Sequence, residues 1–242
     1  MPTPVSLLCL PCAGASATMY LRWRRLLPRW VEVVPVELPG RGSLFSVPFV
    51  DNFEALVSWL CRDQQQALSG RYALFGHSMG ALLAHGMALR QLETGGPLPQ
   101  ALLVAGSPAP MKRDPARFAG KQDDASLIAD LRQQGGTPEE VFANEELMRL
   151  TLDVLAADYR VCASLRPVAD KPLPMPVHAL GGRRDDVGVE RLEAWSAEAG
   201  GVFTVDWFDG GHFFIREQEA LLMPVIEQRL TSAARATLEA WA

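Results

Sequence analysis

A serine between two glycines is the residue of this chain that is best suited to chemistry. Ser78 lies within residues 76–80, Gly-His-Ser-Met-Gly, which match the pattern Gly-x-Ser-x-Gly. Residues 71–75 before it form a run typical of a buried strand, and residues 81–89 after it have a helical pattern. A tight turn between such elements requires the glycines for steric reasons, and it exposes the serine hydroxyl at the positive end of the helix. We therefore predict that Ser78 is a nucleophile.

A serine hydroxyl needs a base to remove its proton, and His212 is the histidine best placed for that task. It follows residues 209–211, Asp-Gly-Gly, at the end of the last predicted strand. A loop of this kind puts an imidazole above the edge of a sheet on a backbone that is free to turn. We expect His77 to point away from Ser78 inside the turn. His85 and His178 are expected to be packed or exposed residues of a helix and a strand.

Two adjacent aspartates compete for the acid that would orient this histidine. In a strand–turn–helix hydrolase the partners follow the nucleophile in the order acid, then histidine. Asp185 and Asp186 both follow the predicted strand at residues 177–180. We favour Asp185 because its spacing places it near the apex of the loop. Asp186 remains the alternative, and its other role would be to cap the helix that follows. The acid would stabilise the imidazolium of His212 without taking its proton.

Backbone amides must stabilise the oxyanion that develops during attack by Ser78. The amide of Met79 is one predicted donor because this residue follows the nucleophile. The loop at residues 10–16 is rich in small residues, so its backbone can approach a substrate closely. Cys12 or Ala13 would supply the second amide, and the sequence does not distinguish them. We do not expect Cys12 to be the nucleophile, because no base is placed for it.

Short apolar runs alternate with helical patterns along the chain. The predicted strands are residues 5–10, 31–36, 72–75, 101–105, 177–180 and 202–207. The predicted helices between and after them are residues 53–68, 81–92, 189–199 and 221–234. This alternation predicts an α/β fold whose central sheet is mostly parallel and is covered by helices on both faces. Functional loops of such folds lie at the carboxyl ends of the strands.

One long segment interrupts the alternation. Residues 108–167 contain no convincing strand, only helical patterns at residues 124–133 and 144–163 and a shorter helix start. That start has Thr137 as the cap and Pro138 at the first helical position. So much helix between two strands predicts a lid inserted into the fold.

Composition limits the classes of protein that remain. With 242 residues and 48% hydrophobic content, the chain is expected to form one domain over residues 1–242. Its net charge of −5 argues against nucleic-acid binding, which needs a basic face. There is no signal-peptide pattern and no apolar run of about 18 residues, so we expect a cytoplasmic protein without a membrane segment. The four cysteines have no histidine partners for a metal site, and we expect reduced thiols and a monomer.

Taken together, these motifs resemble the type II thioesterases. These are stand-alone editing enzymes of polyketide and nonribosomal peptide assembly lines, with the α/β-hydrolase fold. The resemblance extends over nearly the whole chain. The matching stretches are LPCAGASA at 10–17, ELPGRG at 37–42, GHSMGA at 76–81, GGTPEEV at 135–141, GRRD at 182–185 and GGHFF at 210–214.

The resemblance implies a Ser78–His212–Asp185 triad that hydrolyses acyl thioesters through an acyl-enzyme. The substrate would be an acyl chain on the phosphopantetheine arm of an acyl or peptidyl carrier protein, and the role would be to clear stalled or misprimed chains. Such pathways make secondary metabolites or siderophores. No metal or cofactor is implied. The alternative is a carboxylesterase or lipase that acts on small esters with the same triad.

A local group of basic residues suggests how a carrier could be met. Lys112, Arg113, Arg117 and Lys121 lie close together at the start of the predicted lid. We expect this basic cluster to engage an acidic carrier or the phosphate of its arm. The plainer interpretation is a solvated helix face.

Overall fold

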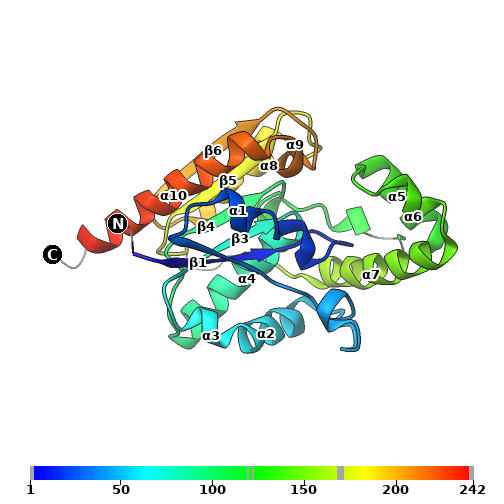
Figure 1. Ribbon diagram of the computed structural model, residues 1–242, viewed down its shortest axis with the longest axis horizontal. Coiled ribbons are helices and arrows are strands. Elements are labelled where there is room, and N and C mark those ends of the chain that lie inside the picture. Colours follow the sequence, from blue (N-terminus) through cyan, green and yellow to red (C-terminus); the bar gives the residue numbers. More distant parts are fainter. Residues whose placement is uncertain (1–2, 119, 122, 168–171, 240–242) are drawn as a thin grey trace.

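A parallel sheet of six strands forms the centre of the molecule (Figure 1). The computed structural model describes residues 3–118, 120–121, 123–167 and 172–239, so residues 119 and 122 of the predicted lid lie outside it. The spatial order of the strands is β2-β1-β3-β4-β5-β6, and each neighbouring pair is parallel. The strands are β1 (Val5–Leu10), β2 (Val31–Pro35), β3 (Tyr72–His77), β4 (Leu102–Ala105), β5 (Val177–Gly182) and β6 (Phe203–Phe208).

Helices occupy both faces of this sheet, as the alternating pattern predicts. The α-helices are α1 (Trp23–Leu26), α2 (Phe53–Asp63), α3 (Gln65–Leu68), α4 (Met79–Thr94), α5 (Asp124–Gln134), α6 (Glu139–Phe142), α7 (Glu145–Ser164), α8 (Val189–Glu193), α9 (Phe214–Glu217) and α10 (Glu219–Glu239). Short 3₁₀ turns are η1 (Ala17–Tyr20), η2 (Gly42–Leu44), η3 (Pro110–Lys112), η4 (Pro115–Phe118) and η5 (Ala194–Glu198). No helix in the described part of the chain is both long and apolar enough to span a bilayer.

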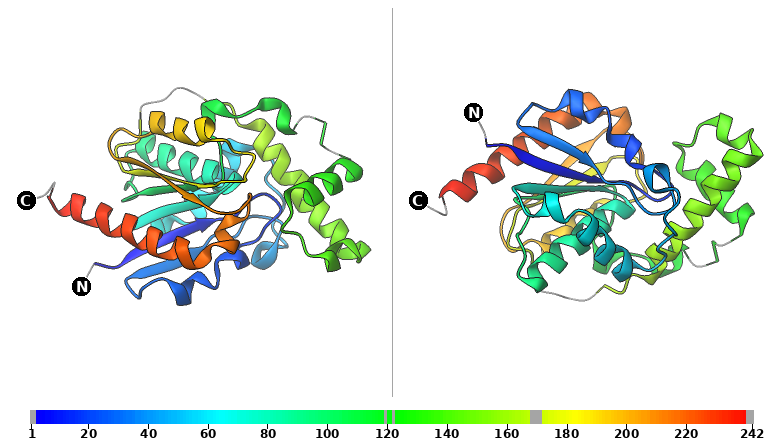
Figure 2. Two further views of the ribbon diagram at one scale, coloured as in Figure 1. Left: turned by 90° about the horizontal axis from the view of Figure 1, so that it is seen from above. Right: turned by 60° about the horizontal axis from the view of Figure 1, so that its bottom comes forward.

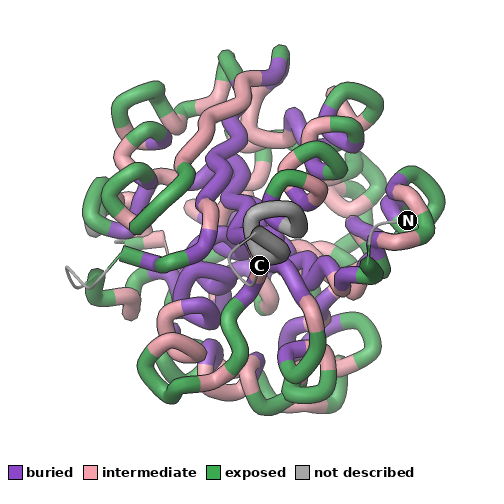
Figure 3. The backbone as a smooth tube through the Cα atoms, turned by 90° about the vertical axis from the view of Figure 1, so that its left-hand side faces the viewer, coloured by how far each residue is buried: buried purple, intermediate pink, exposed green. Residues whose placement is uncertain are grey.

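Alternate residues along each strand feed two separate hydrophobic cores, because successive side chains point to opposite faces. Leu8 and Leu10 of β1 belong to the core under α2, α4 and α8. Leu7 and Cys9 of the same strand belong to the core under α1, α9 and α10. Figure 3 shows the buried strands between more exposed helices, and Figure 2 shows α10 running along one face. The carboxyl edge of the sheet is therefore fixed from both sides.

The segment between β4 and β5 forms η3, η4, α5, α6 and α7, which agrees with its predicted helical content. In Figure 1, α5, α6 and α7 lie to one side of the sheet, past the carboxyl ends of the strands. Asn144 caps α7, since its side chain accepts a hydrogen bond from the Leu147 amide. This helical insertion has a small apolar core of its own, made by Leu127, Leu152, Leu155 and Tyr159.

Three predicted elements differ from the structure. The helix predicted for residues 53–68 is broken at Gln64, which has φ −92° and ψ 13°, into α2 and α3. The helix predicted for residues 189–199 is α-helical only in its first turn and continues as η5. The predicted cap Thr137 is also wrong, because Pro138 is the N-cap of α6 and the helix begins at Glu139. Proline fits there because it has no amide hydrogen to leave unpaired.

Candidate active site

Ser78 stands at the turn between β3 and α4, with a backbone conformation that side chains rarely adopt. Its φ is 55° and its ψ is −116°, and it is the one non-glycine with positive φ among the residues described. A conformation of this kind costs about 1–3 kcal/mol and is found mostly at functional sites. The Ser78 amide donates to the Ala105 carbonyl over 2.8 Å, which extends the ladder between β3 and β4 into the turn. The predicted nucleophile therefore lies at the carboxyl edge of the central strands.

The two glycines of the turn are required by close backbone contacts. A Cβ at Gly76 would lie 2.0 Å from the carbonyl oxygen of Gly80. A Cβ at Gly80 would lie 2.2 Å from the carbonyl oxygen of Leu10, at the end of β1. The absence of these side chains lets the turn close tightly and lets the loop after β1 approach Ser78.

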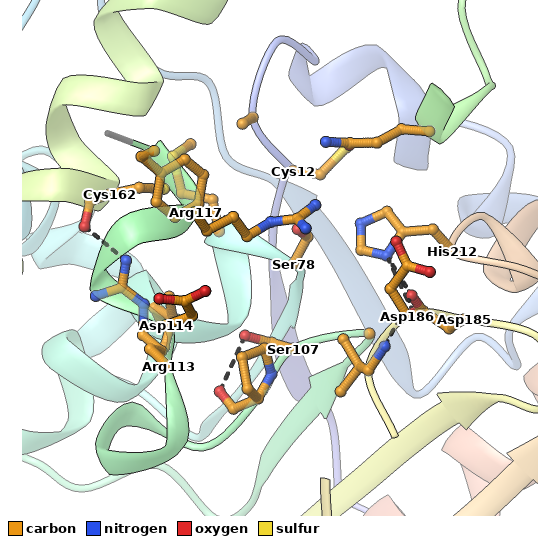
Figure 4. Close-up of a pocket in the computed structure, with 18 of the residues that line it drawn as sticks. Cys12, Ser78, Ser107, Arg113, Asp114, Arg117, Cys162, Asp185, Asp186 and His212 are labelled. Atoms are coloured by element: carbon orange, nitrogen blue, oxygen red, sulfur yellow. Dashed lines mark hydrogen bonds and ion pairs between the residues drawn. The ribbon is translucent and has the colours of Figure 1, made fainter. Parts of the chain in front are cut away.

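His212 and Asp185 form the hydrogen-bonded pair that the sequence predicts. The Nδ1 atom of His212 lies 3.0 and 3.1 Å from the carboxylate oxygens of Asp185. In Figure 4 the imidazole lies between Ser78 and Asp185. Because an ionised carboxylate only accepts, Nδ1 carries the proton and leaves Nε2 free to act as a base. Asp186 is exposed and does not cap a helix, since Gly188 is the N-cap of α8.

The environment of Asp185 keeps it ionised. Its side chain is 2% exposed, and burial alone would raise its pKa. The hydrogen bond from His212 and the amide of Val187 outweigh burial, so the pKa lies below its ordinary value of 3.8. A charged carboxylate is the form that holds the histidine in one tautomer and stabilises its imidazolium.

His77 supports this pair from below, a role that the sequence did not reveal. Its Nε2 donates to the backbone carbonyl of His212 over 2.8 Å, and its ring is fully buried. Burial, and to a smaller extent the neighbouring His212, lower the pKa of His77 to about 3. A neutral ring at this position can hold the His212 backbone without placing a second charge near the His212 imidazole. His85 and His178 lie elsewhere, paired with Glu198 and Thr204.

The loop after β1 forms a turn that faces Ser78. The Ala15 amide donates to the Cys12 carbonyl over 3.1 Å, and Gly14 adopts φ 77° at the third position. The Gly14 amide is bound by Asp158 over 2.8 Å. Cys12 and Ala13, the two predicted donors, line the same cavity as Ser78 and Met79, so both remain candidates. Burial raises the pKa of the Cys12 thiol to about 11, which disfavours it as a nucleophile.

A cavity of about 70 Å³ lies between this edge of the sheet and the helical insertion. Its wall from the sheet side includes Ser78, Met79 and His212, and Phe118 and Tyr159 come from the insertion. No group of three or more potential ligands in the described residues is arranged to hold a metal ion.

The predicted basic cluster is mostly bound within the protein. Lys112 pairs with Glu190 over 3.1 Å. Lys121 pairs with Asp130 over 2.5 Å, and Arg113 donates to the Cys162 carbonyl over 2.6 Å. Arg117 forms no ion pair with a described residue, and its side chain lines the cavity beside Ser78 (Figure 4). Three of the four residues of the cluster therefore have partners within the protein, and its contact with a carrier stays a prediction.

A protein-family model described as "Thioesterase domain" matches residues 5–230. This chain belongs to the thioesterase family. It is a hydrolase of thioesters, and the match covers most of this chain. The parallel sheet and its helices are those of the α/β-hydrolase thioesterases.

Individual relatives agree with the family. The chain is 36% identical to the type II thioesterase BorB from the borrelidin biosynthetic cluster, with a TM-score of 0.84 over 95% of this chain and 94% of that one. The chain is 27% identical to YbtT, a type II thioesterase from the yersiniabactin NRPS/PKS pathway. The TM-score is 0.82, and the match covers 96% of this chain and 94% of YbtT. Linear gramicidin dehydrogenase LgrE of Brevibacillus parabrevis is 33% identical over 91% of this thioesterase and 85% of its own length. That name describes another reaction, but the strained serine beside a histidine–aspartate pair is a feature of hydrolases.

Proposed function

We propose that this thioesterase is an editing enzyme that removes acyl groups from the phosphopantetheine arms of carrier proteins. The observation that carries the proposal is the strained Ser78 next to the His212–Asp185 pair, in a chain that resembles type II thioesterases along its length. The names of BorB and YbtT place those relatives in polyketide and nonribosomal peptide pathways. The partner of this chain is, on the same grounds, an acyl or peptidyl carrier domain.

The proposed mechanism has two steps. The Ser78 Oγ attacks the thioester carbonyl while His212 Nε2 takes its proton, and Asp185 stabilises the resulting imidazolium. The Met79 amide and one amide of the loop after β1 bind the oxyanion. The C–S bond breaks and the thiol leaves with the proton from His212. Water then attacks the acyl-enzyme with His212 as the base, which releases the acid and restores Ser78. This route uses no metal or cofactor.

The helical insertion would act as a lid over this reaction. The cavity lies between the insertion and the sheet edge, so an acyl group bound there would be covered by α7 and η4. Its volume of about 70 Å³ is small beside the roughly 300–1,000 Å³ of pockets that enclose drug-sized ligands. A short acyl group fits this space best. We keep the prediction of a single domain with a lid at residues 108–167 as part of the proposal.

A panel of matched substrates tests the function. Acetyl, butyryl and octanoyl groups would each be presented on a carrier protein, on coenzyme A and as a simple oxygen ester. We expect the acetyl and butyryl carriers to be hydrolysed with the highest kcat/KM. The Ser78→Ala variant should lose nearly all turnover, by about 10⁴-fold or more.

Two outcomes would contradict the proposal. A preference for the oxygen esters would favour the carboxylesterase alternative. Substantial turnover by a folded Ser78→Ala variant would show that the nucleophile has been misassigned. A comparison of carrier and coenzyme A thioesters of the same acyl group isolates the contribution of the carrier itself.

A further inference from the structure

A buried ion pair joins Asp158 of α7, in the insertion, to Arg41 in the segment after β2. Arg41 Nη1 and Nη2 donate to the two carboxylate oxygens of Asp158 over 2.7 and 2.6 Å. The two side chains are only 7% and 2% exposed. Two parallel bonds fix both the distance and the orientation of the groups, as a single contact would not.

The same pair holds the backbone of the loop. Asp158 also accepts from the Gly14 amide over 2.8 Å, and Arg41 donates to the Ala15 carbonyl over 3.0 Å. Gly14 packs against the insertion as well, since a Cβ at that position would lie 3.3 Å from the Leu155 side chain. One carboxylate and one guanidinium therefore bind consecutive residues of the turn that starts at Cys12.

A second anchor holds the other end of this loop. Glu37 accepts from the Ser16 hydroxyl over 2.7 Å and from the Ala17 amide over 3.1 Å. Glu37 and Arg41 both lie in the segment after β2. Together, Glu37, Arg41 and Asp158 bind residues 14–17 of the loop. Cys12 and Ala13, which line the cavity, are not among the residues that they bind.

We propose that Asp158 and Arg41 are positioning residues that set the oxyanion-binding amide of the loop after β1. This inference rests on the proposed function, because it presumes that the loop donates to the oxyanion formed at Ser78. Neither side chain lines the cavity, so both act through the backbone of Gly14 and Ala15. Since Asp158 belongs to α7, the geometry of the oxyanion site depends on how the insertion is docked.

The effect should appear in the transition state and not in substrate binding. An oxyanion donor contacts the tetrahedral intermediate, so a displaced donor lowers kcat while KM changes little. Loss of one such donor costs about 10²–10³-fold in kcat, and a displaced one should cost roughly 10- to 100-fold. A boronic acid that forms a tetrahedral adduct with Ser78 should lose affinity by a similar factor.

The experiment compares Asp158→Ala, Asp158→Asn and Arg41→Lys with wild type. Each variant would be measured for kcat, KM, boronate affinity and thermal unfolding. Asn keeps an oxygen that can accept from Gly14, so Asp158→Asn should recover part of the kcat that Asp158→Ala loses. Asp206→Asn is the matched control, since Arg229 and Asp206 form another bidentate pair, at 2.8 and 3.1 Å, on β6 and α10.

The outcomes separate this inference from the proposed function. A raised KM with unchanged kcat, an unchanged boronate affinity, or an equal loss in Asp206→Asn would overturn it. If Asp158→Ala does not fold, Asp158→Asn and Arg41→Lys decide the question by the same criteria. Failure of the proposed function would appear independently, as wild-type protein that does not hydrolyse thioesters.

Discussion

Asp185 and Asp186 are neighbours in the chain, yet only one of them faces His212. The Asp185 side chain is 2% exposed and hydrogen-bonded to the imidazole, whereas Asp186 is exposed. The loop path decides this: the Asp185 amide is bound to the Gly182 carbonyl over 3.1 Å, and the Arg184 amide to the Gly210 carbonyl over 2.9 Å. Contacts between two loops that are distant in sequence thus select the residue.

Asparagine substitutions at the two positions should behave differently. We expect Asp185→Asn to lower kcat by about 10³-fold or more, since an amide would favour the wrong tautomer of His212. Asp186→Asn should stay within about threefold of wild type because it removes no contact with the imidazole. Steady-state kinetics on one acyl-carrier substrate would check both. Comparable losses in the two variants would argue against our choice of acid.

Local motifs and long-range contacts differ in how far the sequence reveals them. Ser78 and His212 could be predicted because each lies in a short motif next to a predicted strand. The partnership of Arg41 with Asp158 could not, because the two residues are 117 positions apart and neither segment indicates the other. The sequence predicts His77 inside the turn, whereas it is the last residue of β3, and its bond to the His212 carbonyl depends on a loop that approaches only in the folded state.

At the scale of elements, the sequence predicts the positions of the strands well. It does not predict where a helix is interrupted. Buried strands of a parallel sheet stand out as short apolar runs, which is why all six were found. The break at Gln64 and the 3₁₀ turn at η5 keep the apolar pattern of a helix, so periodicity alone does not reveal them. The path of the helical insertion was also beyond prediction, because its packing on the sheet edge depends on side chains from several elements.

The turn between β3 and α4 should tolerate no side chain at its first glycine. In Gly76→Ala, the new Cβ would lie 2.0 Å from the Gly80 carbonyl oxygen, and backbone cannot yield as a side chain can. We expect the free energy of unfolding to fall by at least about 2 kcal/mol and activity to be largely lost. Urea denaturation measures the first effect. Gly201→Ala is the control, since its Cβ would meet no atom within 4 Å; an equal loss there would refute the steric argument.

For the molecule as a whole, two neutral buried histidines make stability depend on pH. Burial lowers the pKa of His178 from 6.5 to about 4 and is the main cause that lowers that of His77 to about 3. Below pH 6.5 these histidines bind protons in the unfolded chain but not in the folded protein. Their contribution to the free energy of unfolding is therefore fully present above pH 6.5 and is lost as the pH drops toward 3.

The contribution of one of these two histidines can be measured separately. Between pH 7.5 and pH 5, His178 should account for about 2 kcal/mol of lost stability. We expect the His178→Gln variant, which cannot titrate there, to show a smaller drop than wild type by that amount. Urea unfolding at the two pH values gives both differences. Equal drops in the two proteins would show that His178 already binds a proton in the folded state.

The pairing of β4 with β5 across residues 106–176 bears on when activity can arise during synthesis of the chain. Strands β1 to β4 emerge first from the ribosome and can pair through shorter connections, which bring Ser78 into its turn. Contacts of large sequence separation form more slowly, so β5 and β6, with Asp185 and His212 after them, are expected to dock late. A nascent or truncated chain would then carry the proposed nucleophile without its proposed base, and hydrolysis would begin only once β5 and β6 have docked.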